Sequence, residues 1–120
     1  MASLTQLKKY YNHEFDDWGG TTSKDYKGFE SKYINYIKRI CKDNEWQFIS
    51  GNRNHYQFSC VIQRNDSIYI YISISDVRYW HNEWYNRILI RTMKHATDWT
   101  GNSNNYSNLE NLVENISKLR

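Results

Sequence analysis

The sequence predicts an α+β domain: a four-stranded antiparallel meander with two helices before it and one helix after it. Three observations predict this class. Apolar residues recur every three or four positions near both ends of the chain, they recur every two positions in its middle, and proline is absent. The first spacing is typical of amphipathic helices and the second of half-buried strands. The expected order of elements is therefore α-α-β-β-β-β-α.

Two helices are expected before the sheet. The first begins after Ser3 and ends at Gly19-Gly20; its apolar positions are Leu4, Leu7, Tyr11, Phe15 and Trp18. The second begins near Thr22 and ends at Asp43-Asn44. Its apolar positions form one continuous stripe, made of Tyr26, Phe29, Tyr33, Ile34, Ile37, Ile40 and Cys41. A stripe of this kind places one face of a helix against a core.

Four strands are expected in the middle of the chain. The first alternates Trp46 and Phe48 with polar residues and ends in a turn at Ser50-Gly51-Asn52. Asn65-Asp66 marks a hairpin between the second and third strands. The apolar positions of strands two to four are Tyr56, Phe58, Cys60 and Ile62, then Ile68, Ile70, Ile72 and Ile74, then Ile88 and Ile90.

A third helix is expected after a polar, asparagine-rich loop that begins at Gly101. Ser107 with Glu110 forms a capping-box pattern, and the apolar positions that follow are Leu109, Leu112, Val113, Ile116 and Leu119. We expect the helices to cover the apolar face of the sheet. The opposite face would then show His55, Gln57, Ser59, Tyr69, Tyr71, Ser73, Arg87 and Arg91. The sequence leaves open whether the last helix covers that face instead.

Length and charge place limits on the function. We expect a single domain over residues 1–120, because no linker-like stretch divides the chain. The net charge of +3 is mild, and the basic residues gather in the middle of the chain as Lys32, Lys38, Arg39, Lys42, Arg53 and Arg64. Such charges commonly form a solvated face, so nucleic-acid binding is permitted but not implied.

Cysteine usage and hydropathy predict a cytoplasmic protein. Cys41 and Cys60 are the two cysteines, and both fall on apolar faces. Two free, buried thiols in a reducing compartment are favoured over a disulfide between helix and sheet. No stretch has the character of a signal peptide or the length of a membrane span. We therefore expect no membrane association.

The best candidate for a contact surface begins at the aromatic loop around residues 79–85. Aromatic rings and arginines bring large contact area or planar hydrogen bonding for little ordering entropy. The candidate binding residues are Tyr69, Tyr71, Tyr79, Trp80, His81, Trp84, Arg87 and Arg91. Tyrosines on strands and tryptophans at the edge of a core give the competing structural interpretation. We expect one of Trp80 and Trp84 to be buried and the other to be exposed.

Catalytic and metal-binding motifs are missing. His81 and Glu83 resemble the opening of the zinc deaminase signature, but the Pro-Cys-x-x-Cys part is absent. His95 followed by Asp98 could orient a general base, although a surface histidine is the more frequent case. The chain has no phosphate-binding glycine loop and no nucleophile elbow. We therefore expect no enzymatic activity, no metal and no cofactor.

The amino-acid composition of the chain resembles that of a general class of small proteins. Ile, Asn, Tyr and Lys make up more than a third of the residues, and their codons are AT-rich. In this, in its size and in its lack of catalytic motifs, the chain resembles small proteins of phages and mobile elements from low-GC bacteria, including anti-CRISPR inhibitors. That resemblance implies stoichiometric binding to a host protein complex that handles nucleic acid. The alternatives are binding of single-stranded nucleic acid on the open sheet face, and a small enzyme that uses His81, Glu83 and His95.

Overall fold

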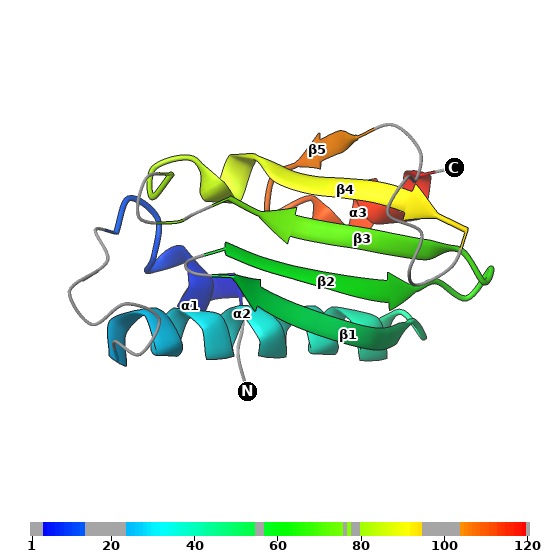
Figure 1. Cartoon of the computed structure of the whole chain (residues 1–120), viewed down its shortest axis with the longest axis horizontal. Coiled ribbons are helices and arrows are strands. Elements are labelled where there is room, and N and C mark those ends of the chain that lie inside the picture. Colours follow the sequence, from blue (N-terminus) through cyan, green and yellow to red (C-terminus); the bar gives the residue numbers. More distant parts are fainter. Residues whose placement is uncertain are drawn as a thin grey trace.

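A five-stranded antiparallel sheet in the order β1-β2-β3-β4-β5 forms the centre of the computed structural model (Figure 1). The strands are β1 (Gln47–Asn54), β2 (Gln57–Gln63), β3 (Tyr69–Ile74), β4 (Ile88–Met93) and β5 (Asn105–Ser107). The structure describes residues 4–13, 24–54, 57–75, 77, 80–94 and 104–119. The predicted α+β class and the meander are confirmed, whereas the predicted number of four strands is wrong.

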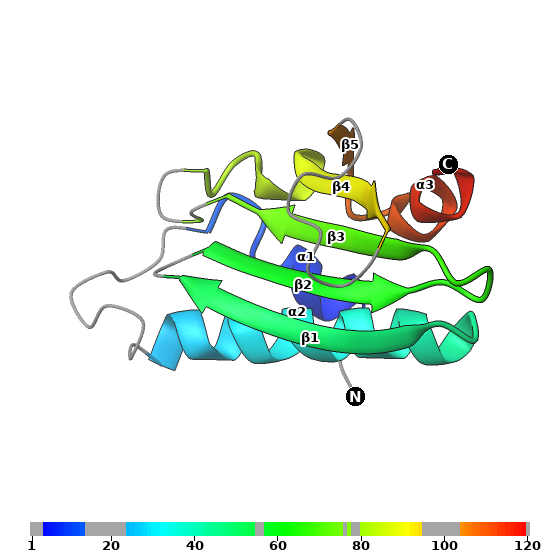
Figure 2. The same ribbon diagram turned by 45° about the vertical axis from the view of Figure 1, so that its right-hand side comes forward.

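All described helices lie on one face of this sheet (Figures 1 and 2). They are α1 (Leu4–Lys8), α2 (Lys24–Asp43) and α3 (Leu112–Lys118), with a short 3-10 turn, η2 (Trp84–Asn86), before β4. The core joins α2 to the sheet and to α3 through Phe29, Tyr33, Ile37, Ile62, Ile70, Ile72, Ile74, Ile88, Leu112 and Ile116. The last helix, α3, therefore does not cover the opposite face of the sheet, which we call the outer face.

The additional strand is β5, which lies in the segment predicted to be a polar loop. Leu89 of β4 pairs with Tyr106, and Ile88 pairs with Ser107. Ser107 is buried, while Asn105 and Tyr106 are exposed. With three residues, β5 is too short to show a period in the sequence. The pairing of β5 with β4 determines the conformation of β5, and the local propensity of its residues does not.

The predicted turn at Ser50-Gly51-Asn52 is also wrong, because β1 continues through it. The register with β2 shifts between Phe48 and Ser50, which makes a β-bulge at Ile49. A Cβ on Gly51 would lie 3.1 Å from the Phe58 ring and 3.3 Å from the Phe48 ring. The glycine therefore makes room for two aromatic rings inside a strand, which is a known use of glycine in sheets.

The first helix is shorter than predicted. It ends at Lys8, and residues 9–12 form turns in which Tyr10 N–H donates to the Leu7 carbonyl at 3.0 Å. This change of direction lets Tyr10 pack edge-on against Phe29. Parts of several predictions lie outside the described residues or side chains: Phe15, Trp18, Gly19-Gly20, Thr22, Tyr26, His55, Tyr56, Gln57, Tyr79, His95, Asp98 and Gly101.

The predicted capping box at Ser107 and Glu110 is wrong, because Ser107 belongs to β5. Its hydroxyl accepts a hydrogen bond from the Asn115 side-chain amide at 2.9 Å. The turn before α3 is closed by Asn108, whose side-chain oxygen accepts from the Asn111 N–H at 3.0 Å. Asparagine closes such turns well because its side chain imitates a backbone carbonyl.

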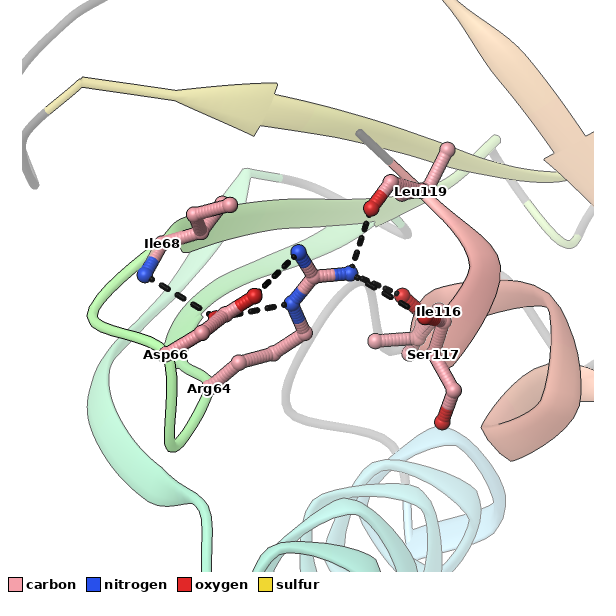
Figure 3. Close-up of polar contacts among 6 residues, drawn as sticks. All are labelled: Arg64, Asp66, Ile68, Ile116, Ser117 and Leu119. Atoms are coloured by element: carbon pink, nitrogen blue, oxygen red, sulfur yellow. Dashed lines mark hydrogen bonds and ion pairs between the residues drawn. The ribbon is translucent and has the colours of Figure 1, made fainter.

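A buried arginine attaches the C-terminal helix to the sheet (Figure 3). The Arg64 guanidinium donates to the carbonyls of Ile116 at 2.7 Å and Leu119 at 2.6 Å, where α3 ends. Asp66 holds the other side of the guanidinium at 2.8 Å. Burial alone would raise the pKa of the Asp66 carboxyl, but the hydrogen bonds from Arg64 and from the Ile68 N–H lower it. Cations at helix C-termini stabilise the unpaired carbonyls there.

The two cysteines are free and buried, as predicted. Burial raises the pKa of the Cys41 thiol from its ordinary value of 9.0 to about 11. Burial, together with the nearby Cys41, also raises the pKa of Cys60. Both thiols therefore stay protonated at neutral pH. In the described part of the chain, no helix is long and apolar enough to cross a membrane.

Candidate contact surface

The two tryptophans of the aromatic loop have different environments, as the sequence predicted. Trp84 is fully buried, while 40% of Trp80 is exposed. The Trp84 ring lies edge-on against Phe29 at 4.9 Å and against Tyr33 at 6.3 Å, measured between ring centroids. Its indole Nε1–H donates to the Tyr10 carbonyl at 3.4 Å. Trp84 therefore belongs to the core, and Trp80 is the residue of the pair that can contact a partner.

The N-terminal segment holds the aromatic loop in place. The Asn12 N–H donates to the His81 carbonyl at 2.9 Å, and the Tyr85 hydroxyl donates to the Asn12 side-chain oxygen at 3.3 Å. Tyr11 stacks on Tyr85 with 3.8 Å between ring centroids. Burial, followed by the effect of the Glu110 carboxylate, raises the pKa of the Tyr11 hydroxyl to about 12. Tyr11 and Asn12 thus hold the aromatic loop in a fixed position.

An exposed arginine lies between two aromatic rings beside this loop. The Arg87 guanidinium carbon is 5.0 Å from the centre of the Trp80 ring and 5.9 Å from the centre of the Tyr106 ring. Glu83 contacts the same guanidinium at 3.7 Å. Tyr106 is 56% exposed, and about half of the Arg87 side chain is exposed. We call these three residues, Trp80, Arg87 and Tyr106, the Trp80–Arg87–Tyr106 surface.

Tyr106 joins this surface because of strand pairing. It lies opposite Leu89 in the β4–β5 ladder, and Leu89 comes two residues after Arg87 in the chain. The site predicted from the sequence lacks Tyr106, because the polar residues around it indicate a loop that approaches the last helix. One feature of the sequence could have pointed to Tyr106: it is a lone aromatic residue in a polar stretch.

The second predicted group, on the outer face, is more enclosed than expected. Arg91 stacks on Tyr71 with 4.8 Å between the guanidinium carbon and the ring centre. Tyr69 and Tyr71 are half-buried, and their cross-strand neighbours Met93 and Val61 are buried. The Arg91 Nε–H is buried and has no hydrogen-bond partner among the described residues. As far as the described residues show it, this face is therefore packed around Tyr71 and Arg91 and offers no flat row of exposed rings.

The aromatic loop also carries two of the three residues of the enzyme alternative, His81 and Glu83. His81 is half-buried, and Glu83 lies against Arg87. The third residue of that hypothesis, His95, lies outside the described part of the chain. Within the described residues no group of three or more metal-ligating side chains comes together.

The structure thus brings four of the predicted site residues together in two pairs and places Trp84 apart from them in the core. Trp80 and Arg87 meet, Tyr71 and Arg91 meet on the outer face, and Trp84 lies in the core. Comparisons with protein-family models, with curated proteins and with solved structures find no match to this chain. The Trp80–Arg87–Tyr106 surface is therefore the basis on which a function is proposed.

Proposed function

We propose that this chain is a small binding protein that acts stoichiometrically on a protein complex that handles nucleic acid, in the manner of phage and mobile-element inhibitors. The observation that carries this proposal is the exposed Arg87 guanidinium between the rings of Trp80 and Tyr106. Tryptophan, tyrosine and arginine are the residues that most often dominate the binding energy of protein interfaces.

The geometry of this surface supports an anchor for a partner protein. Contact with two rings restrains the Arg87 side chain, so less entropy is lost when a carboxylate or phosphate of the partner binds to it. The two rings add exposed apolar area beside the charge. Arg87 is paired with Glu83 in the free protein, with 3.7 Å between their charged atoms. Because this ion pair is exposed, it is weak, and an acidic group of the partner can replace Glu83.

The nature of the partner is inferred from composition and charge. The frequent use of amino acids with AT-rich codons and the small size of the chain support an origin in a phage or mobile element of a low-GC bacterium. Many of the small proteins that this chain resembles bind stoichiometrically to a host nucleoprotein. The mild charge of +3 supports contact with protein surfaces over mimicry of DNA.

The test is a capture experiment followed by a titration. The tagged protein and a Trp80→Ala/Arg87→Ala variant are used to recover partners from lysate of a low-GC bacterium, and the recovered complex is then purified. We expect the variant to lose at least about tenfold in affinity, the loss typical of interface anchors. Lys118→Ala is the control, because Lys118 is also an exposed cation paired four residues away, with Glu114 at 2.9 Å.

The proposal is wrong if the double variant recovers the partner as well as the unchanged protein does. It is also wrong if the purified complex keeps its activity on nucleic acid when the protein is present at one copy per complex. The Tyr71→Ala/Arg91→Ala variant reports separately on the outer face.

Binding of single-stranded nucleic acid is tested in parallel. Arg91 already stacks on one side of Tyr71, which leaves less of that ring for a base. We expect fluorescence anisotropy with labelled oligonucleotides at low salt to show no binding. Binding that weakens as salt rises would instead favour the nucleic-acid alternative, because phosphate contacts release counterions.

A further inference from the structure

The free edge of β1 differs from the opposite edge of the sheet. Strand β1 has eight residues, whereas β5 has three. Among the described residues, no strand pairs with the side of β1 that faces away from β2. Proteins usually protect an edge with short strands, prolines or several charges. Strand β1 has no proline and one charged residue, Arg53.

The register of β1 shows which backbone groups are available at this edge. Asn54 pairs with Gln57 across a two-residue connection, and such a pair exchanges both of its backbone hydrogen bonds. Pairs along an antiparallel ladder alternate between bonded and non-bonded. Ser50 and Asn52 therefore bond to β2 like Asn54, while Gly51 and Arg53 direct N–H and C=O away from it. These groups are spaced as an added strand requires.

Basic side chains lie on α2, the helix that runs along this edge, and one of them, Lys38, is near a residue of β1. The Lys38 ammonium is 5.2 Å from the centre of the Phe48 ring on β1. Lys38, Arg39 and Lys42 line a surface hollow of about 460 Å³ together with Asn35 and Asp43. In both Figure 1 and Figure 2 the helix runs along β1 at this side of the sheet. An added strand would therefore lie beside a surface with a net positive charge.

We propose that the free edge of β1 accepts an extended, acidic segment of a partner protein as a sixth strand, with its carboxylates near Lys38, Arg39 and Lys42. Backbone hydrogen bonds supply affinity in this mode of recognition, and side-chain contacts supply specificity. The exposed Ile49 at the bulge adds apolar contact area. A second copy of this chain is disfavoured, because it would bring two basic α2 surfaces together.

This inference does not depend on the proposed function. The Trp80–Arg87–Tyr106 surface lies at the β4–β5 side of the sheet, and β1 is the opposite edge. Variants of one surface therefore leave the other unchanged, and the failure of one proposal is separable from the failure of the other.

The test is an NMR titration of the full chain with a capped octapeptide of alternating valine and glutamate. We expect saturable shifts of the Gly51 and Arg53 amide signals, with weaker binding when salt is raised from about 50 mM to about 500 mM. A peptide of alternating valine and lysine is the charge control and should bind at least about tenfold more weakly, since like charges at an interface are unfavourable.

Two variants separate the backbone contribution from the charge contribution. Arg53→Pro and Arg53→Ala both remove the charge, but only proline removes the outward N–H. We expect Arg53→Pro to bind at least about tenfold more weakly than Arg53→Ala, as loss of a main-chain contact in strand addition implies. Lys38→Glu/Lys42→Glu changes exposed residues only and should also reduce binding about tenfold, because it places like charges at the contact.

Three results of the peptide titrations would overturn the inference. These are the absence of saturable shifts, equal binding of the lysine peptide, and equal binding by Arg53→Pro and Arg53→Ala. Shifts at β1 that depend on protein concentration without peptide would show that a second copy occupies the edge, which also overturns it. If Arg53→Pro does not fold, as judged by circular dichroism, the glutamate variant decides the outcome.

Discussion

The Arg64 side chain connects the β2–β3 turn to the end of α3, and it does so in a buried position. A guanidinium suits this place because its planar set of donors meets Asp66 on one side and helix carbonyls on the other (Figure 3). Sequence reasoning placed Arg64 in a basic surface region. Its burial could not be read from local pattern, since it follows from the position of a helix more than fifty residues later.

We expect Arg64→Met to lower the free energy of unfolding by about 2–4 kcal/mol, because buried carbonyls and Asp66 lose a charged partner. Arg64→Lys should recover only part of this, since an ammonium cannot reach both sides. Urea unfolding measures the change. Arg87→Met is the matched control, and as an exposed site it should change stability by less than about 0.5 kcal/mol. An equal, small effect of both substitutions would contradict the role assigned to Arg64.

Among the elements, long periodic ones could be predicted and short ones could not. The stripe of α2 and the alternation of β3 appear in the structure, because each repeats over enough residues to determine a buried face. The β1 bulge was missed because glycine beside serine and asparagine is usually a turn. Strand β5 was missed because three residues carry no period. The contact between Arg87 and Tyr106 depends on β5 and could not be predicted without it.

Two glycines give substitutions of opposite sign at the level of an element. In β1, Gly51→Ala would push against the buried Phe58 ring at 3.1 Å, and we expect a loss of about 1 kcal/mol. In α2, a Cβ on Gly28 would meet, among the described residues, only the Tyr10 hydroxyl, at 3.2 Å. Because alanine is a better helix former, we expect Gly28→Ala to stabilise the protein by up to about 1 kcal/mol. Thermal unfolding of both variants measures this, and the same sign for both would refute it.

For the whole molecule, the buried thiols predict how stability depends on pH. The pKa of Cys41 rises from 9.0 in an unfolded chain to about 11 in the fold. Between these values the unfolded chain releases the proton first, so it binds fewer protons and stability falls as pH rises. We expect full stability below about pH 9, with a decline up to about pH 11. Urea unfolding across this range measures it.

Cys41→Ala is the control for the pH effect. Its stability should fall less steeply between pH 9 and pH 11, because one of the buried groups that titrates there is gone. An unchanged slope would show that other groups, such as the buried Tyr33 hydroxyl, whose pKa is raised by burial, account for the decline.

The contact between the N-terminal segment and Trp84 has a consequence for synthesis on the ribosome. The Trp84 indole and the Tyr10 carbonyl that it contacts are separated by 74 residues in the chain. At about 5–20 residues per second, these residues are made about 4–15 s apart. The β1–β2 and β2–β3 hairpins, whose connections are short, can form within microseconds of leaving the ribosome. The contact between the N-terminal segment and the aromatic loop can therefore form only after these two hairpins have begun to form, although Tyr10 is among the first residues made.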